Sequence, residues 1–202
     1  MASVSRINGF RPVKSITGAP YNGGANLYFL PSSYATAVQV GDLVKLAGDA
    51  RSPSGVPTVN RCGATDAAVG VITAIIFSGV GDVANVPAVT NLDVPVYGAA
   101  STNRYVLVAD DPNLVFEAQC TGTLATADIG LNVDPDVTAG STTTGASGMS
   151  IDLSTKATTA TLPLKLVGFP QRPDNNIGDS FVNAYVVINN HQLKGSTGTA
   201  GV

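Results

Sequence analysis

The stretch Thr158–Gln192, TTATLPLKLVGFPQRPDNNIGDSFVNAYVVINNHQ, determines the fold prediction for this chain. Near each of its ends, apolar and polar residues alternate with a period of two, which is typical of strands that cover a core with one face. The two apolar faces consist of Leu162, Leu164 and Leu166, and of Val182, Ala184, Val186 and Ile188. The Pro, Asn and Gly residues between them are typical of turns. The stretch therefore predicts two strands of a one-sided sheet.

The composition predicts a mainly β protein. Only 12% of the 202 residues are charged, about half of the ~25% that is usual in soluble domains. Glu117 is the only Glu, and exposed helices are normally rich in Glu, Lys, Gln and Arg. We therefore expect a single mainly β domain with long loops. The low charge has two open explanations: much of the surface meets neighbouring subunits, or Thr, Ser and Asn provide solubility.

The chain divides into three predicted parts. Residues 1–35 contain many turn residues and only isolated apolar ones, so they are expected to be disordered or to form an extended arm that lies on a partner or a sister subunit. Residues 36–193 form the barrel-like domain, in which residues 134–148 are a low-complexity loop. Residues 194–202 are a flexible tail.

Within the domain, the strands and loops are predicted from alternation and turn residues. Predicted strands are Val38–Ala47, the apolar and central Ala67–Phe77, and the short Leu92–Gly98, whose Pro95 places it at an edge or a bulge. Long loops are expected at Asp49–Asp66 and Ser78–Thr90, and a short helix or turn at Thr126–Ile129. The sequence Asp-Asp-Pro-Asn at residues 110–113 separates Tyr105–Val108 from Leu114–Gln119, which predicts a β-hairpin.

No catalytic or metal-binding pattern is found. His191 is the only histidine, so a nucleophile–histidine relay would need it, but the chain has no nucleophile motif. We expect His191 to cap a strand or contact a neighbour. The adjacent Asp110 and Asp111 point to opposite faces of a strand end, unlike a glycosidase pair. Asp134 and Asp136, with Asp128 nearby, lack the Gly and Glu of a calcium loop, so a turn with exposed carboxylates is expected. The prediction is a protein without enzyme activity, metal or cofactor.

Charge and hydrophobicity exclude other classes of function. The net charge is −3 and no basic stripe exists, so nucleic-acid binding is not expected. No run reaches the ~18 to 20 apolar residues of a membrane helix, and the N-terminus lacks the apolar segment of a secretory signal, so synthesis in the cytoplasm is expected.

Cys62 and Cys120 lack zinc-site spacing. We expect two buried free thiols, and a disulfide between them is the alternative.

Three stretches resemble a family of tailed-bacteriophage virion proteins, the structural, decoration or cement proteins encoded with the major capsid protein. They are Tyr105–Gln119 (YVLVADDPNLVFEAQ), Ala125–Asp134 (ATADIGLNVD) and Thr159–Leu193. The resemblance implies a β-barrel or β-tulip-like protein, bound in many copies to the outer surface of the capsid. It also implies a homo-oligomer, most simply a trimer, that stabilises the head. Its partner would be the major capsid protein and its location the virion. Residues 1–35 and 49–66 take no part in the resemblance.

Under that hypothesis, Ile7, Phe10 and Val13 of the arm would dock in grooves between capsid subunits. Two other classes stay open. A virion adhesin or head-fibre module would bind a host-surface glycan through Tyr21, Tyr28 and Tyr34. A virion-associated hydrolase would have to use the single His191 and the single Glu117.

Overall fold

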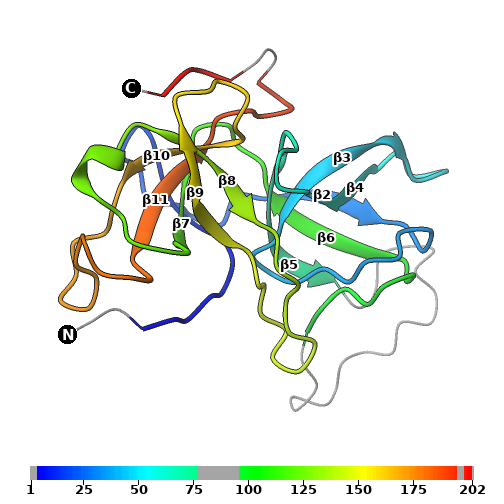
Figure 1. Cartoon of the computed structure of the whole chain (residues 1–202). Helices are drawn as coiled ribbons and strands as arrows, with labels where there is room; N and C mark the ends of the chain where they lie inside the picture. Colours follow the sequence, from blue (N-terminus) through cyan, green and yellow to red (C-terminus); the bar gives the residue numbers. More distant parts are fainter. Residues whose placement is uncertain (1–3, 77–95, 195–197, 202) are drawn as a thin grey trace.

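The protein is built from β-strands, which confirms the predicted class. The computed structural model describes residues 4–76, 96–194 and 198–201, and over these ranges it contains eleven strands and one 3-10 helix, η1 (Thr126–Asp128). The strands form two sheets, the second of which closes on itself (Figure 1). No helix within these ranges is long and apolar enough to cross a membrane.

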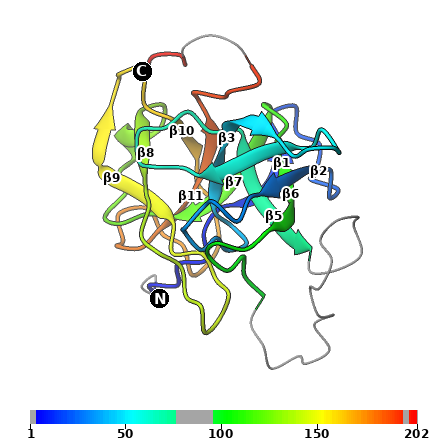
Figure 2. The ribbon, with the colours of Figure 1, turned by 90° about the vertical axis from the view of Figure 1, so that its right-hand side faces the viewer.

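The first sheet has six strands in the order β1-β7-β11-β10-β8-β9, and every neighbouring pair is antiparallel. Its strands are β1 (Arg11–Ser15), β7 (Leu114–Gln119), β11 (Asn183–Ile188), β10 (Leu164–Gly168), β8 (Asn132–Asp136) and β9 (Ser150–Ala157). The pair β10–β11 is the one that alternation predicted. Figure 2 shows β8 and β9 on the side of the molecule away from β1, in agreement with this order.

The second sheet has five strands that hydrogen-bond in a ring, in the order β2-β4-β3-β5-β6. They are β2 (Asn26–Leu30), β4 (Pro57–Arg61), β3 (Leu43–Ala50), β5 (Gly70–Ile76) and β6 (Arg104–Ala109). The pairs are antiparallel, except that β2 and β4 close the ring in parallel through Phe29 and Thr58. β5 confirms the predicted central strand, and β3 overlaps the predicted Val38–Ala47 strand.

The six-stranded sheet packs its inner face against the ring. One cluster of buried apolar residues joins Phe116, Leu164 and Val186 of the sheet to Leu43 and Val71 of the ring. A second, smaller cluster fills the ring itself. In β11 and the residue before it, the predicted alternation holds, because Val182, Ala184, Val186 and Ile188 are all buried. On the opposite face, β1, β10 and β11 keep partly exposed residues, whereas β7 is buried on both faces.

The predicted hairpin around residues 110–113 is wrong. β6 pairs with β2 and β5 in the ring, whereas β7 pairs with β1 and β11 in the other sheet. The turn is therefore a crossover between sheets. The buried Asp110 fixes it, because its carboxylate accepts hydrogen bonds from Asn26 Nδ2 at 2.9 Å and from the Tyr28 hydroxyl at 2.7 Å. Local turn chemistry does not determine which strands pair.

The predicted N-terminal arm is also wrong. Residues 11–15 are β1, which pairs with β7, and residues 26–30 are β2, which pairs with β6. Phe10 is only 1% exposed and belongs to the main core. The strands are short and lack a strong alternation, so pairing with distant strands is what gives them their structure.

Three predicted loop regions differ from the structure in part. The Asp49–Asp66 loop contains β4, whose Val59 is fully buried. The loop at residues 134–148 begins inside β8, which ends at Asp136. In the predicted tail, residues 198–201 hold to the sheet, because Lys165 Nζ donates to the carbonyl of Ala200 at 2.7 Å. The predicted Ser78–Thr90 loop and most of the Leu92–Gly98 strand lie outside the described residues.

A buried polar network fastens the ring to the segment before β9. Asp42 is fully buried and accepts from Arg61 Nε at 3.1 Å and from the Ser147 hydroxyl at 2.5 Å. The guanidinium of Arg61 also donates to the carbonyls of Val137 and Thr138. This network explains why a Thr, Gly and Ser-rich segment lies against the ring.

Candidate functional site

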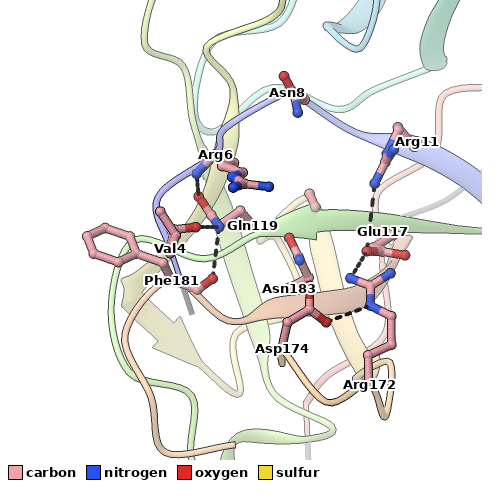
Figure 3. Close-up of a pocket in the computed structure, with 12 residues that line it drawn as sticks. Val4, Arg6, Asn8, Arg11, Glu117, Gln119, Arg172, Asp174, Phe181 and Asn183 are labelled. Atoms are coloured by element: carbon pink, nitrogen blue, oxygen red, sulfur yellow. Dashed lines mark hydrogen bonds and ion pairs between the residues drawn. The ribbon is translucent and has the colours of Figure 1, made fainter. Parts of the chain in front are cut away.

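A cleft of about 580 Å³ opens at one end of the outer face of the six-stranded sheet. Its walls are the N-terminal segment with the start of β1, the end of β7, and the loop between β10 and β11 (Figure 3). The lining residues used below are Val4, Arg6, Arg11, Glu117, Gln119, Arg172, Asp174 and Phe181. Three arginines and two carboxylates meet there, although they are far apart in the sequence.

Glu117 lies on the floor of the cleft. In the strand register it stands beside Arg11 of β1 and Tyr185 of β11, on the face opposite the buried Phe116. Its side chain is 8% exposed, and its Oε1 lies 2.7 Å from Arg172 Nη2 and 3.9 Å from Arg11 Nη2. The hydrogen bond to Glu117 raises the pKa of Arg172. Glu117 is thus a paired, structural carboxylate.

Gln119 holds the N-terminal segment in place. Its Oε1 accepts from the backbone N–H of Arg6 at 2.8 Å, and its Nε2 donates to the carbonyl of Val4 at 3.0 Å. The same Nε2 donates to the carbonyl of Phe181 at 2.9 Å. One buried side chain therefore joins both walls at this end of the cleft.

Phe181 stands at the rim of the cleft in an unusual backbone conformation. Its φ is +61°, in the left-handed region that is strained for a bulky residue. Its side chain is 39% exposed, and the exposed Val4 is close by on the opposite wall (Figure 3). Strained backbone conformations cluster at active sites and ligand-binding sites.

Arg6 is the least engaged cation of the cleft. Across the described part of the chain, its guanidinium makes no hydrogen bond or ion pair, and the residue is exposed. Arg172 contacts Glu117 and, at 3.7 Å, Asp174. With three arginines against two carboxylates, the cleft carries an excess of one positive charge.

The positive charge continues along the outer face. A second cleft of about 380 Å³ includes Lys165, Lys194, Ile16 and Val167. Lys14 of β1 lies over the Tyr185 ring, 5.1 Å from its centroid. We call the outward residues of β1, β7, β10 and β11, with the linings of the two clefts, the outer face.

The outer face is charged oppositely to the whole chain. It carries six of the eleven cationic residues but only two carboxylates, which gives +4 in a chain of net charge −3. The two carboxylates are Glu117 and Asp174, and the six cations are Arg6, Arg11, Lys14, Lys165, Arg172 and Lys194. Four strongly exposed apolar residues also lie on this face: Val4, Ile16, Val167 and Phe181.

The three predicted capsid-contact residues differ in how deeply they are buried. Ile7 and Val13 are half-buried, while Phe10 is buried in the core and is not available for docking as predicted. None of the three lines the cleft. The sequence prediction missed Arg6, Arg11 and Arg172, since isolated arginines carry no motif. The unusual single Glu was the only signal that pointed near the site.

Of the three tyrosines considered for a glycan site, one is buried and two are half-buried. Tyr28 is buried with its hydroxyl on Asp110. The Tyr34 hydroxyl accepts from the backbone N–H of Arg61 at 3.1 Å, and the Tyr21 hydroxyl donates to the carbonyl of Gly24 at 3.0 Å. Each hydroxyl is therefore engaged within the chain.

The other residues considered for chemistry lie away from the cleft. His191 is buried, its Nδ1 accepts from the backbone N–H of Leu193 at 3.1 Å, and burial lowers its pKa. Cys62 and Cys120 are buried free thiols, as favoured, and burial raises the pKa of Cys120 to about 12. Asp134 is buried rather than exposed, which corrects the prediction for that turn.

Metal ligation and similarity to known proteins give no further assignment. Among the described residues, no group of three or more His, Cys, Asp or Glu side chains could hold a metal ion. The chain matches no protein-family model, no curated protein and no solved structure. The function is therefore argued from the geometry and from the resemblance of the three stretches.

Proposed function

We propose that the chain is a structural protein of a tailed-bacteriophage virion, a cement or decoration protein that binds the outer capsid surface without enzyme activity. The observation that carries the proposal is the outer face. It combines an excess of positive charge with four exposed apolar side chains and two clefts. Apolar patches rimmed by polar residues are typical of surfaces that meet another protein, and the four side chains fall in two pairs, one in each cleft.

The position of the resembling stretches supports this reading. Tyr105–Gln119 contains β7, and Thr159–Leu193 contains β10 and β11. These strands and the loop before β11 supply Glu117, Lys165, Val167, Arg172, Asp174 and Phe181 to the outer face, whereas Val4, Arg6, Arg11, Lys14 and Ile16 come from residues 4–16. The stretches that resemble virion proteins therefore contribute about half of the surface proposed to bind the capsid.

The mode of binding differs from the arm model. Phe10 is part of the core, so it cannot dock on the capsid as predicted. The outer face takes its place as the proposed contact surface. Ile7 and Val13 remain candidate contacts at its border. Many copies, each with a modest interface, would bind firmly if they also contact one another, because each bound copy raises the effective concentration of the next. A trimer is the proposed arrangement.

Co-sedimentation tests the proposal. Heads of the phage that encodes the chain, prepared without it, are mixed with the purified protein, and saturable binding is expected. Replacing Lys14 and Lys165 by Glu should weaken binding at least tenfold, because both cations lie on the outer face. Lys156→Glu on β9 is the matched control, since Lys156 pairs with Asp128 and lines neither cleft. Wild-type protein that stays in the supernatant would refute capsid binding.

A further inference from the structure

Arg6 and Arg11 have hydrogen-bond donors that the protein does not use. The described residues give the Arg6 guanidinium no hydrogen bond or ion pair. The Arg11 side chain is 65% exposed, and its one ion pair, with Glu117, is 3.9 Å long. A guanidinium carries five N–H donors in a planar fork that matches a carboxylate. The N-terminal wall of the cleft therefore presents two open binding groups for an anion.

These two groups start from fixed backbone positions. The N–H of Arg6 is bound to the buried Gln119, and Arg11 pairs in register with Glu117. Figure 3 shows Arg6 and Arg11 on the same wall, on either side of Asn8 and across from Arg172 and Asp174. Fixed backbone lowers the entropy lost when a guanidinium engages a ligand.

The carboxylates within the cleft do not satisfy these groups. Glu117 is bound at 2.7 Å by Arg172, and Asp174 lies 3.7 Å from the same arginine. Glu117 thus offers Arg11 only the long contact and gives Arg6 none. An external carboxylate would supply the missing partner.

The rim adds a second element of recognition. Val4 is strongly exposed and Phe181 partly so, and the two lie together at the end of the cleft nearest Arg6. An occupant that places an apolar side chain next to an acidic one would contact all three residues. A free inorganic anion would leave the apolar rim uncovered.

We propose that this cleft binds an acidic segment of a protein partner, with Asp or Glu carboxylates on Arg6 and Arg11 and a neighbouring apolar side chain on Val4 and Phe181. The identity of the partner as a capsid protein rests on the proposed function. The charge excess of the outer face complements such a segment. Charge-assisted guanidinium–carboxylate pairs would set the register of the partner on the cleft.

A peptide array tests the chemistry without any virion. The probes are 15-residue peptides in which Asp or Glu alternates with Leu or Phe, each synthesised beside its counterpart with Asn or Gln. Labelled protein should bind the acidic peptides about tenfold better than the amide counterparts, a preference that decreases with added salt. In Arg6→Gln/Arg11→Gln, the preference should disappear. Lys156→Gln should retain it.

The controls keep the test interpretable. Among the described residues, the Arg6 side chain makes no hydrogen bond or ion pair and Arg11 makes one long ion pair, so circular dichroism should show an unchanged melting temperature for the double variant. Equal binding of acidic and amide peptides by wild-type protein overturns the inference, as does a double variant that keeps the preference. If the protein binds heads but shows no preference for acidic peptides, the cleft inference is rejected and the proposed function stands. An acidic preference without head binding supports the cleft chemistry and rejects the capsid as the partner.

Discussion

The side-chain oxygen of Gln119 accepts a hydrogen bond of 2.8 Å from the backbone N–H of Arg6, 113 residues earlier in the chain. Its amide nitrogen binds the carbonyls of Val4 and Phe181. The Gln119 side chain therefore binds the N–H of Arg6 and the carbonyl of Val4, as a neighbouring β-strand would. The position of Arg6 in the cleft depends on this side chain.

Gln119→Ala should free the segment before β1 and destabilise the protein by about 1–3 kcal/mol, since three partly buried backbone groups lose their partner. Trypsin should then cleave after Arg6 several times faster than in the wild type, while the rest of the chain stays resistant. The measurements are mass spectrometry of the early digest and urea unfolding. Gln171→Ala, at an exposed residue without a hydrogen bond to the described residues, should change neither. An unchanged digest in Gln119→Ala would show that other contacts hold the segment.

Phe181→Asn should leave the melting temperature unchanged or raise it. The left-handed conformation at φ +61° costs a bulky residue roughly 1–2 kcal/mol, and Asn adopts it more readily. The loss of a partly exposed ring offsets some of this gain. Phe169→Asn is the comparison, because Phe169 packs against the core with no such strain, and it should destabilise the protein. If both variants melt equally early, the Phe181 ring contributes more packing than its exposure indicates.

The sequence contained enough information for the class and for one pair of strands. Val182, Ala184, Val186 and Ile188 alternate because β11 covers the core with one face, and this signal lies within one strand. The pairing of β7 with β11 and β1, instead of β6, depends on contacts between residues far apart in the chain. Periodicity within a strand does not contain that information.

The candidate site could not be predicted for a related reason. Its residues come from positions 4–11, 117–119 and 172–183, and none forms a motif with its neighbours. Phe10 appeared to be a surface anchor because the residues around it are polar or turn-forming, yet it completes the core beneath β1. The single Glu was visible in the sequence, but its two arginine partners were not.

Asp42→Asn should be strongly destabilising. Arg61 is almost fully buried, and the substitution removes its only carboxylate among the described residues. Breaking a buried ion pair by neutralising one partner costs about 3–5 kcal/mol, because the other charge stays buried. Lys45→Ala, which breaks the more exposed pair with Asp66, should cost at most about 1 kcal/mol. Urea unfolding of the two variants measures the contrast, and similar losses would mean that the Asp42 network is hydrated.

Asp134→Asn should stabilise the protein at neutral pH. Asp134 and Asp152 stand directly opposite each other on β8 and β9, and the Oδ1 of Asp134 is buried without a hydrogen-bond partner in the described structure. Burial and then the charge of Asp152 raise the pKa of Asp134. Like charges in this arrangement cost up to about 1 kcal/mol, and the neutral Asn removes that cost.

The pH dependence of this variant follows from the direction of the pKa shift. A carboxyl whose pKa is raised in the folded state stabilises the fold when protonated, and this contribution is lost as the pH rises through the folded pKa. The melting temperature of Asp134→Asn should therefore exceed that of the wild type at pH 7, and the difference should shrink as the pH falls towards 4. Asp49→Asn, at an exposed residue, should show no such trend. A difference that stays constant from pH 7 to pH 4 would locate the effect in packing rather than in charge.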